Sequence, residues 1–359
     1  MANIMTYLDW WGEIPFTQVP FNEVDNLIMT QLCFLDFSDI ADNDNEVTLA
    51  EAAKKYFQSN VGKKISIGMI IPRQVIDLLR KTALSVRFSD IVLSNYVNII
   101  DNEKMLQFAA LTAKLCDNTV AVVFRGTDDT LIGWKEDFHL ACQTPVPAQI
   151  QAVKYLNSVA NETEGDMILM GHSKGGNLAI YSAVHVSDEI RARIRSIYNN
   201  DGPGFNDGTL TTDAFLSIQD RVHSFVPQSS FVGMLLDHDS KYDVVKSSQI
   251  SLLQHDVFSW EVMGGKLLRT EFSPESKRRN DTISALINSM DCEQRTIMVE
   301  AFFRAIQSTN ATTLTELFED KTALLKIFRN LSKEDKLIFK DVFRKIREET
   351  RKNIFKPKE

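Results

Sequence analysis

Short apolar runs alternate with amphipathic stretches through the middle of the chain. The apolar runs predict strands at residues 89–101, 106–115, 119–126 and 166–170. Residues 195–206, 221–228 and 241–249 are each predicted to hold a short strand followed by a loop. Residues 148–163 and 175–190 carry apolar side chains at helical spacing between these runs. This alternation is typical of an α/β fold with a mostly parallel sheet, in which the functional site lies at the carboxyl ends of the strands.

The two ends of the chain have a helical pattern. Residues 20–37 place apolar side chains on one helical face, and residues 73–88 are also predicted to be helical. Beyond residue 273 the chain has helical periodicity, many charges and no strand-like run. We therefore expect an α/β domain with N-terminal helical or cap elements over residues 1–273, and a helical C-terminal region over residues 274–359.

Composition narrows the class of protein without identifying it. The 359 residues are 44% hydrophobic and 25% charged, as in ordinary water-soluble proteins. The net charge of −8 argues against general binding to nucleic acid. The start of the chain lacks the pattern of a signal peptide, and no apolar stretch is long enough to predict a transmembrane segment, so we expect a cytoplasmic protein.

The cysteines are scattered along the chain, which predicts reduced thiols rather than a disulfide framework or a zinc site. They are Cys33, Cys116, Cys142 and Cys292. No metal and no cofactor are predicted from any motif.

A glycine-rich motif surrounds one serine. Residues 171–176 read GHSKGG and hold three of the 15 glycines. In a G-x-S-x-G turn between a strand and a helix, the glycines let the two elements approach and leave the serine exposed at the apex. The motif predicts that Ser173 is a nucleophile; the alternative is a tight turn whose serine only caps the following helix.

A serine nucleophile needs a base, and the chain offers few suitable histidines. In the α/β-hydrolase arrangement the acid and then the histidine follow the serine along the chain. His255 comes after the last predicted strand, where this architecture places its base, and His238 is the alternative. His172 lies within the turn itself and is not expected to serve as the base.

The acid that orients the histidine is less clearly marked. Asp201 follows the strand after the nucleophile's helix, in NNDGPGF. Asp237, Asp239 and Asp243 lie between the next two strands and are alternatives. We predict Asp201.

Two residues are predicted to donate hydrogen bonds to the oxyanion. The backbone N–H of Lys174, directly after the nucleophile, is one donor, and we expect the Lys174 side chain to face solvent. The second is Thr127, whose N–H and hydroxyl lie after an earlier predicted strand. The alternative makes Arg125 and Asp128 a structural turn held by an ion pair.

These motifs together resemble a known family. VVFRGTDDTLIGWKEDF, followed by GHSKGGNLA, is similar to the paired signatures of class 3 (fungal-type) lipases. With PFNEVDNLI and QHDVFSW added, residues 5–350 resemble a bacterial family of lipase-like α/β-hydrolases. The resemblance implies an α/β-hydrolase fold, the roles given above for Ser173, Thr127, Lys174 and His255, and a lid over residues 128–138. Three apolar side chains of that lid would contact an acyl chain: Leu131, Ile132 and Trp134.

The sequence differs from class 3 lipases at two places. No carboxylate follows the strand at residues 221–228, where those lipases carry their acid, but NNDGPGF resembles the acid loop of pancreatic-type lipases and supports Asp201. Lys174 also replaces the usual leucine.

The sequence therefore predicts an esterase or lipase-like serine hydrolase with a Ser-His-Asp triad, acting on a small-molecule ester or lipid-like substrate. A thioesterase or amidase with the same triad is one alternative, and a non-catalytic binding or scaffold protein is another. The oligomeric state stays open, a homo-oligomer included.

Overall fold

The architecture comes from a computed structural model. The structure describes residues 1–43, 45–65, 67–115, 118–206, 208–236, 238, 241–273 and 289–354.

An eight-stranded sheet forms the centre of the molecule, and its strands follow one another in chain order. They are β1 (Val47–Thr48), β2 (Val92–Asp101), β3 (Leu106–Lys114), β4 (Val120–Phe124), β5 (Met167–His172), β6 (Ile194–Asn200), β7 (Val222–Pro227) and β8 (Asp243–Val245). The pairs from β1 to β4 are antiparallel, and those from β4 to β8 are parallel. A separate two-stranded sheet joins β9 (Val262–Met263) to β10 (Lys266–Leu267).

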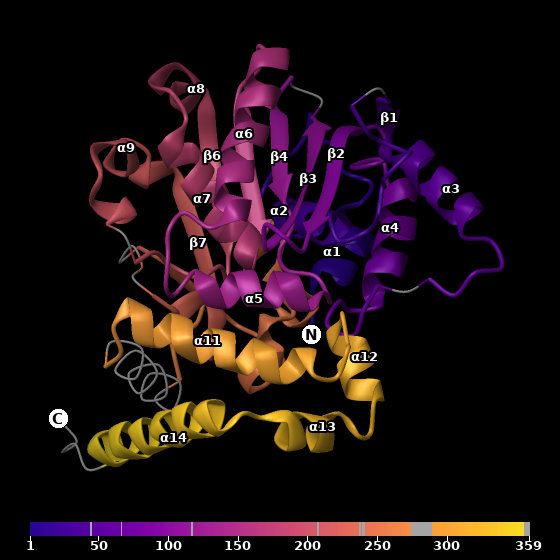
Figure 1. The fold of residues 1–359 in the computed structure, drawn as a ribbon. Helices are drawn as coiled ribbons and strands as arrows, with labels where there is room; N and C mark the ends of the chain where they lie inside the picture. The colour runs from indigo at the N-terminus through magenta and orange to yellow at the C-terminus, as the bar shows by residue number, and fades with distance from the viewer. Residues whose placement is uncertain are drawn as a thin grey trace.

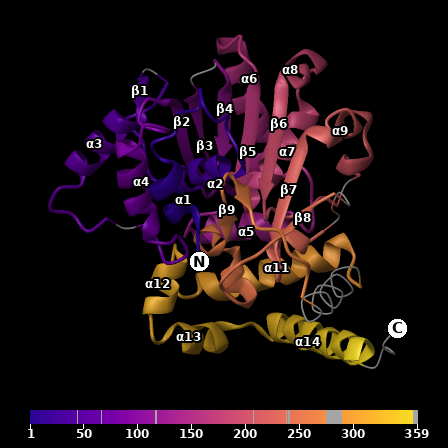
Figure 2. The same ribbon diagram turned by 180° about the vertical axis from the view of Figure 1, so that it is seen from behind.

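Helices cover both faces of the sheet (Figures 1 and 2). One face packs against α1 (Ile4–Trp11), α2 (Glu23–Leu32), α3 (Leu49–Ser59) and α4 (Gln74–Leu84). The other face packs against α6 (Pro147–Glu162), α7 (Lys174–His185), α8 (Asp188–Ala192) and α9 (Asp213–Leu216).

The central strands are apolar on both sides because both faces of the sheet are covered. In β4, Ala121 and Val123 belong to the core under α2, whereas Val120, Val122 and Phe124 belong to the core under α6 and α7. Successive side chains of a strand point to opposite faces, so a strand between two helical layers has an unbroken apolar run.

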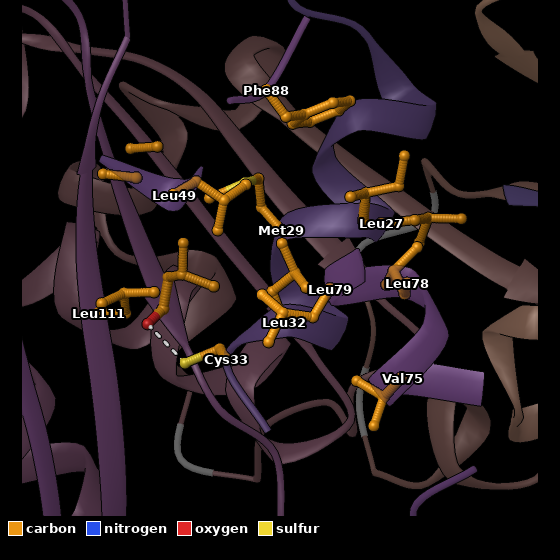
Figure 3. Close-up of a cluster of buried hydrophobic side chains, with 14 of the residues drawn as sticks. Leu27, Met29, Leu32, Cys33, Leu49, Val75, Leu78, Leu79, Phe88 and Leu111 are labelled. Atoms are coloured by element: carbon orange, nitrogen blue, oxygen red, sulfur yellow. Dashed lines mark hydrogen bonds between the residues drawn. The ribbon is translucent and has the colours of Figure 1, made fainter. Parts of the chain in front are cut away.

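The α2 side of the core is shown in Figure 3. Leu27 and Leu32 of α2 lie beside Leu78 and Leu79 of α4, whereas Met29 points toward Leu49, and all of these side chains are fully buried. This core fixes the N-terminal helices to the sheet.

A second helical group lies at the edge of the sheet where the parallel strands end. It consists of α5 (Leu131–His139), α11 (Cys292–Gln307), α12 (Leu314–Glu319), α13 (Ala323–Asn330) and α14 (Lys333–Ile354). Figure 1 shows α5 below the sheet, α11 below α5, and α13 and α14 below α11. The C-terminal helices therefore lie at the sheet edge that carries the predicted site.

The predicted α/β fold, with a mostly parallel sheet and a helical C-terminal region, is confirmed. Several boundaries differ by a few residues, and the single helix predicted over residues 175–190 is two helices, α7 and α8. Val186 is extended, and Ser187 caps α8 by accepting a hydrogen bond from the Ile190 N–H. Within the described parts of the chain, no helix is long and apolar enough to cross a membrane.

Candidate active site

Ser173 occupies a sharp turn between β5 and α7. Its backbone has φ 57° and ψ −133°, a conformation that non-glycine residues rarely adopt, and its N–H donates to the Asn200 carbonyl at 2.9 Å. A Cβ at Gly171 would lie 2.0 Å from the Gly175 carbonyl carbon, and one at Gly175 would lie 2.1 Å from the Phe124 carbonyl oxygen. Only glycine allows this close approach of strand and helix. The serine at the apex is half-exposed.

Asp201 and His255 form a hydrogen-bonded pair. Asp201 directly follows β6, has φ 53° and is 1% exposed. Its Oδ2 lies 2.6 Å from Nδ1 of His255, which ends the 3₁₀ helix η4 (Ser251–His255). The structure thus brings together the predicted acid and base, from residues 54 positions apart.

The second carboxylate oxygen of Asp201 is also satisfied. Its Oδ1 accepts hydrogen bonds from the Ser230 hydroxyl and, at 3.1 Å, from the Gly233 N–H. Because both of its oxygens accept hydrogen bonds, the buried carboxylate has a fixed orientation. Ser230 lies in the segment where the sequence offered no acid, and its role in holding the acid was not predicted.

His172 connects the acid–base pair to the nucleophile turn. Its Nε2–H donates to the His255 carbonyl at 2.9 Å, and the two imidazole rings have centroids 4.5 Å apart. Burial, and then the neighbouring His255, hold the pKa of His172 well below its ordinary value, so its ring is neutral. Because His172 directly precedes Ser173 in the chain, these contacts hold the Asp201–His255 pair against the turn that carries Ser173. No supporting role for His172 is predicted from the sequence.

Both predicted oxyanion donors are direct chain neighbours of residues in the Ser173 turn or packed against it. Lys174 is the first residue of α7. Thr127 follows Gly126, where a Cβ would lie 3.2 Å from the Ser173 Cβ and 2.6 Å from the His172 carbonyl oxygen. The Thr127 hydroxyl donates a hydrogen bond to Asp137. The backbone N–H of Thr127 is therefore the donor that remains for an oxyanion.

The Lys174 side chain is buried. It is 1% exposed, and its ammonium donates to Glu136 Oε2 at 2.9 Å. The expectation that this side chain faces solvent is wrong. The acidic pair Glu136 and Asp137 was the signal available in the sequence, but nothing in the sequence alone links it to a lysine 38 positions later.

The alternatives weighed from the sequence lie elsewhere or outside the described residues. Asp243 pairs with Arg269 at 2.7 Å on the surface, and Asp237 and Asp239 lie outside the described residues. His238 lines a small cavity, of about 20 Å³, with Ile180 and Tyr242.

Arg125 and Asp128 do form the expected ion pair, at 2.8 Å. The turn that they close leads from β4 to α5 and contains Thr127. The structural interpretation of this segment is therefore confirmed, and Thr127 lies within the same turn.

The apolar side of α5 faces the C-terminal helices. Leu131 is 7% exposed and belongs to a cluster with Val299 and Phe303 of α11, and Trp134 packs against the same cluster. These two side chains, which were expected to contact an acyl chain, instead contact protein.

An amide pair that the sequence analysis missed supports the nucleophile turn from the N-terminal side. Asn26 of α2 and Asn200 exchange side-chain hydrogen bonds at 2.9 and 3.0 Å. Asn200 also donates to the Gly171 carbonyl at 3.0 Å. The motif PFNEVDNLI thus holds the strand ends on which Ser173 and Asp201 depend.

The comparisons agree with this picture at the level of class and family. The fold is an α/β fold with its serine motif at the strand ends, and residues 82–304 match the family model described as Mbeg1-like, a family related to lipase-like proteins. That match covers more than half of the chain, and the chain belongs to this family. No curated protein matches the chain.

Proposed function

We propose that this protein is a serine hydrolase that cleaves carboxylic esters through an acyl-enzyme. The single observation that carries the proposal is the Asp201–His255 pair, with its 2.6 Å hydrogen bond, packed through His172 against the strained turn of Ser173. Ser-His-Asp constellations are recognised by this geometry rather than by sequence position.

The chemistry assigns one role to each residue. Ser173 Oγ attacks the ester carbonyl carbon while Nε2 of His255 takes the hydroxyl proton, and the oxyanion accepts hydrogen bonds from the N–H groups of Thr127 and Lys174. The tetrahedral intermediate then expels the alcohol, which takes the proton from His255. A water molecule, deprotonated by His255, then attacks the carbonyl carbon of the acyl-enzyme. The carboxylic acid leaves, and Ser173 Oγ regains its proton from His255.

Asp201 has a fixed part in these steps. Its Oδ2 holds the Nδ1–H of His255, which leaves Nε2 free to take and give the proton. It also stabilises the imidazolium that forms in each half of the cycle.

Labelling with a fluorophosphonate probe tests the nucleophile. We expect the wild type to be labelled, Ser173→Ala to be unlabelled, and the control Ser217→Ala, which removes an exposed hydroxyl, to be labelled as the wild type is. A folded wild type that is not labelled would contradict the proposal and favour a binding role.

Replacing His255 tests the proposed role of the Asp201–His255 pair. We expect His255→Ala to lower kcat on a p-nitrophenyl ester by about 10³-fold or more, because the serine loses its base, with little change in thermal stability. His238→Ala is the control and should leave kcat unchanged. The opposite result would move the base to His238.

Substrate class is the next question for the same site. A panel of p-nitrophenyl esters from short to long acyl chains, run beside matched thioesters and anilides, ranks these bonds by kcat/KM. We expect the oxygen esters to rank first. A larger kcat/KM for thioesters or anilides would replace the ester proposal with one of these activities.

A further inference from the structure

Lys174, the residue directly after the proposed nucleophile, has a buried ammonium group. Lys174 Nζ donates to the Gln107 carbonyl at 3.0 Å, to Gln107 Oε1 at 2.7 Å and to Glu136 Oε2 at 2.9 Å. All three donors of the ammonium are therefore used. Burial alone lowers the pKa of Lys174, but the Glu136 and Asp137 carboxylates outweigh burial and raise it above the ordinary value.

Glu136 joins four elements of the fold. It is 1% exposed, its Oε1 accepts the Ala148 N–H of α6 at 2.8 Å, and its Oε2 accepts the Gln107 N–H of β3 at 3.2 Å. With Lys174 it links α5, α6, α7 and β3. A buried charge pair is costly to separate, so α5 is firmly held in this position.

The same helix holds Thr127. Asp137, the next residue, accepts the Thr127 hydroxyl, and its Oδ1 lies 3.5 Å from Lys174 Nζ. At Gly133 an added Cβ would lie 3.0 Å from Thr127 Cγ2 and 3.0 Å from Gln107 Oε1, so glycine lets α5 pack closely against both residues. Any movement of α5 therefore changes the place of Thr127 relative to the first residue of α7.

We propose that the Lys174–Glu136 ion pair is a positioning device for the oxyanion hole. It holds α5, and through Asp137 it holds Thr127, at a fixed distance from the Lys174 N–H. The Lys174 side chain does not touch the substrate and acts through Thr127. The inference rests on the proposed hydrolase function and adds two positioning side chains to it.

The test replaces both charges at once. In Lys174→Met with Glu136→Gln both charges of the pair are removed together, and glutamine keeps an acceptor for the Ala148 N–H. Asp137 also loses its neighbouring ammonium, but burial already raises its pKa, so it can take up a proton and we expect the protein to fold. We expect kcat and the rate constant for fluorophosphonate labelling to fall about tenfold, as when part of an oxyanion site is displaced, with KM changed less than about threefold.

A matched control separates positioning from stability. Arg191 is buried and donates to the Ala183 and Val184 carbonyls at the opposite end of α7. Arg191→Met should lower the melting temperature at least as much as the double variant does, without changing kcat.

Coupling to Thr127 provides a second readout. In a Thr127→Val background, which lacks the hydroxyl held by Asp137, the double change should cost kcat less than about threefold, because residues acting through one another are not additive. An additive loss would overturn the proposal, as would an unchanged kcat in the double variant. If the double variant does not fold, the single variant Glu136→Gln is the test, and its kcat and labelling rate constant are again expected to fall.

Failure of this inference is distinguishable from failure of the proposed function. An unlabelled wild type would overturn both. A labelled wild type with an equally reactive, folded variant would overturn the positioning role alone.

Discussion

Ser173 and Asp201 both have positive φ values, 57° and 53°, although neither is glycine. Each such residue costs on the order of 1–2 kcal/mol, and the surrounding structure must supply that energy. The N–H groups of both residues are hydrogen-bonded to neighbouring strand ends, at 2.9 Å to the Asn200 carbonyl and 2.8 Å to the Phe225 carbonyl. The two strained residues are therefore fixed to the same sheet edge.

Asp137 makes stability depend on pH. Burial, opposed by Lys174, raises the pKa of Asp137 to about 6 from its ordinary 3.8. The folded protein then binds this proton more tightly than the unfolded chain does, so the contribution to stability is complete below about pH 4 and is lost as pH rises through about 6.

Asp137→Asn removes this titration while keeping an acceptor for Thr127. We expect the free energy of unfolding of the wild type, minus that of Asp137→Asn, to fall by on the order of 2 kcal/mol between pH 4 and pH 7. Urea unfolding at intervals of one pH unit measures this difference. Parallel profiles for the two proteins would contradict the assignment.

At the residue scale, the sequence marks the residues proposed to carry chemistry more clearly than the residues that support them. Ser173, His255 and Asp201 are marked by a local motif and by chain order. His172, Ser230 and the Lys174 side chain are not, because their partners are chosen by three-dimensional contact between distant segments. Lys174 follows a G-x-S motif on a surface-like pattern, and only its approach to Glu136 shows that it is buried.

At the scale of elements, the turn between β5 and α7 depends on close contact with β4. The carbonyl of Phe124, at the end of β4, leaves no room for a side chain at residue 175. A side chain at residue 175 would therefore displace the strand, the turn and the helix together.

Gly175→Ala tests this contact. Because the new Cβ would lie 2.1 Å from the Phe124 carbonyl oxygen, we expect the start of α7 to move away from the end of β4. We expect stability to fall by roughly 3 kcal/mol and fluorophosphonate labelling to be lost. Circular dichroism melts and labelling measure the two effects.

Gly62→Ala is the comparison for that experiment. A Cβ there meets nothing within 4 Å, although φ is +74°. We expect a cost of only about 1 kcal/mol and normal labelling. Equal effects at both glycines would mean that backbone conformation, rather than space, sets the cost.

The elements themselves were largely predictable, because strand and helix periodicities are local properties of the chain. Residues 119–126 have the apolar run of a strand buried on both faces, and β4 is such a strand. The break between α7 and α8 was missed because Val186 keeps the apolar periodicity while its backbone leaves the helix.

At the scale of the whole molecule, the C-terminal helices are joined to the α/β part by an apolar contact. Phe303 of α11 is 3% exposed, and its ring lies 5.8 Å from that of Phe138 in α5. Lys135 and His139 of α5 also pair with Glu300 of α11, at 2.9 and 3.1 Å. We propose that residues 1–273 and the C-terminal helical region unfold as one unit.

Phe303→Ala tests this joint unfolding. The cavity left in the contact should lower the free energy of unfolding by about 3–5 kcal/mol, in a single transition. Phe318→Ala, at a side chain that is 67% exposed, should change it by less than about 0.5 kcal/mol. Two separate transitions by calorimetry would show instead that the regions unfold independently.

The packing of the C-terminal helices on α5 could not be predicted from the sequence. The pattern beyond residue 273 predicts helices but not the surface on which they pack. That surface depends on the apolar side of α5, which the resemblance to class 3 lipases assigned to an acyl chain.

Backbone hydrogen bonds also join the C-terminal region to the segment that follows Thr127. The Leu131 N–H donates to the Thr312 carbonyl, and the Leu314 N–H donates to the Asp129 carbonyl, both at 2.9 Å. Asp129 lies two positions after Thr127. A molecule that binds the C-terminal helices and alters these bonds would therefore also alter how tightly a tetrahedral acyl mimic is held. Thermodynamic reciprocity then requires the mimic to alter the binding of that molecule by the same factor.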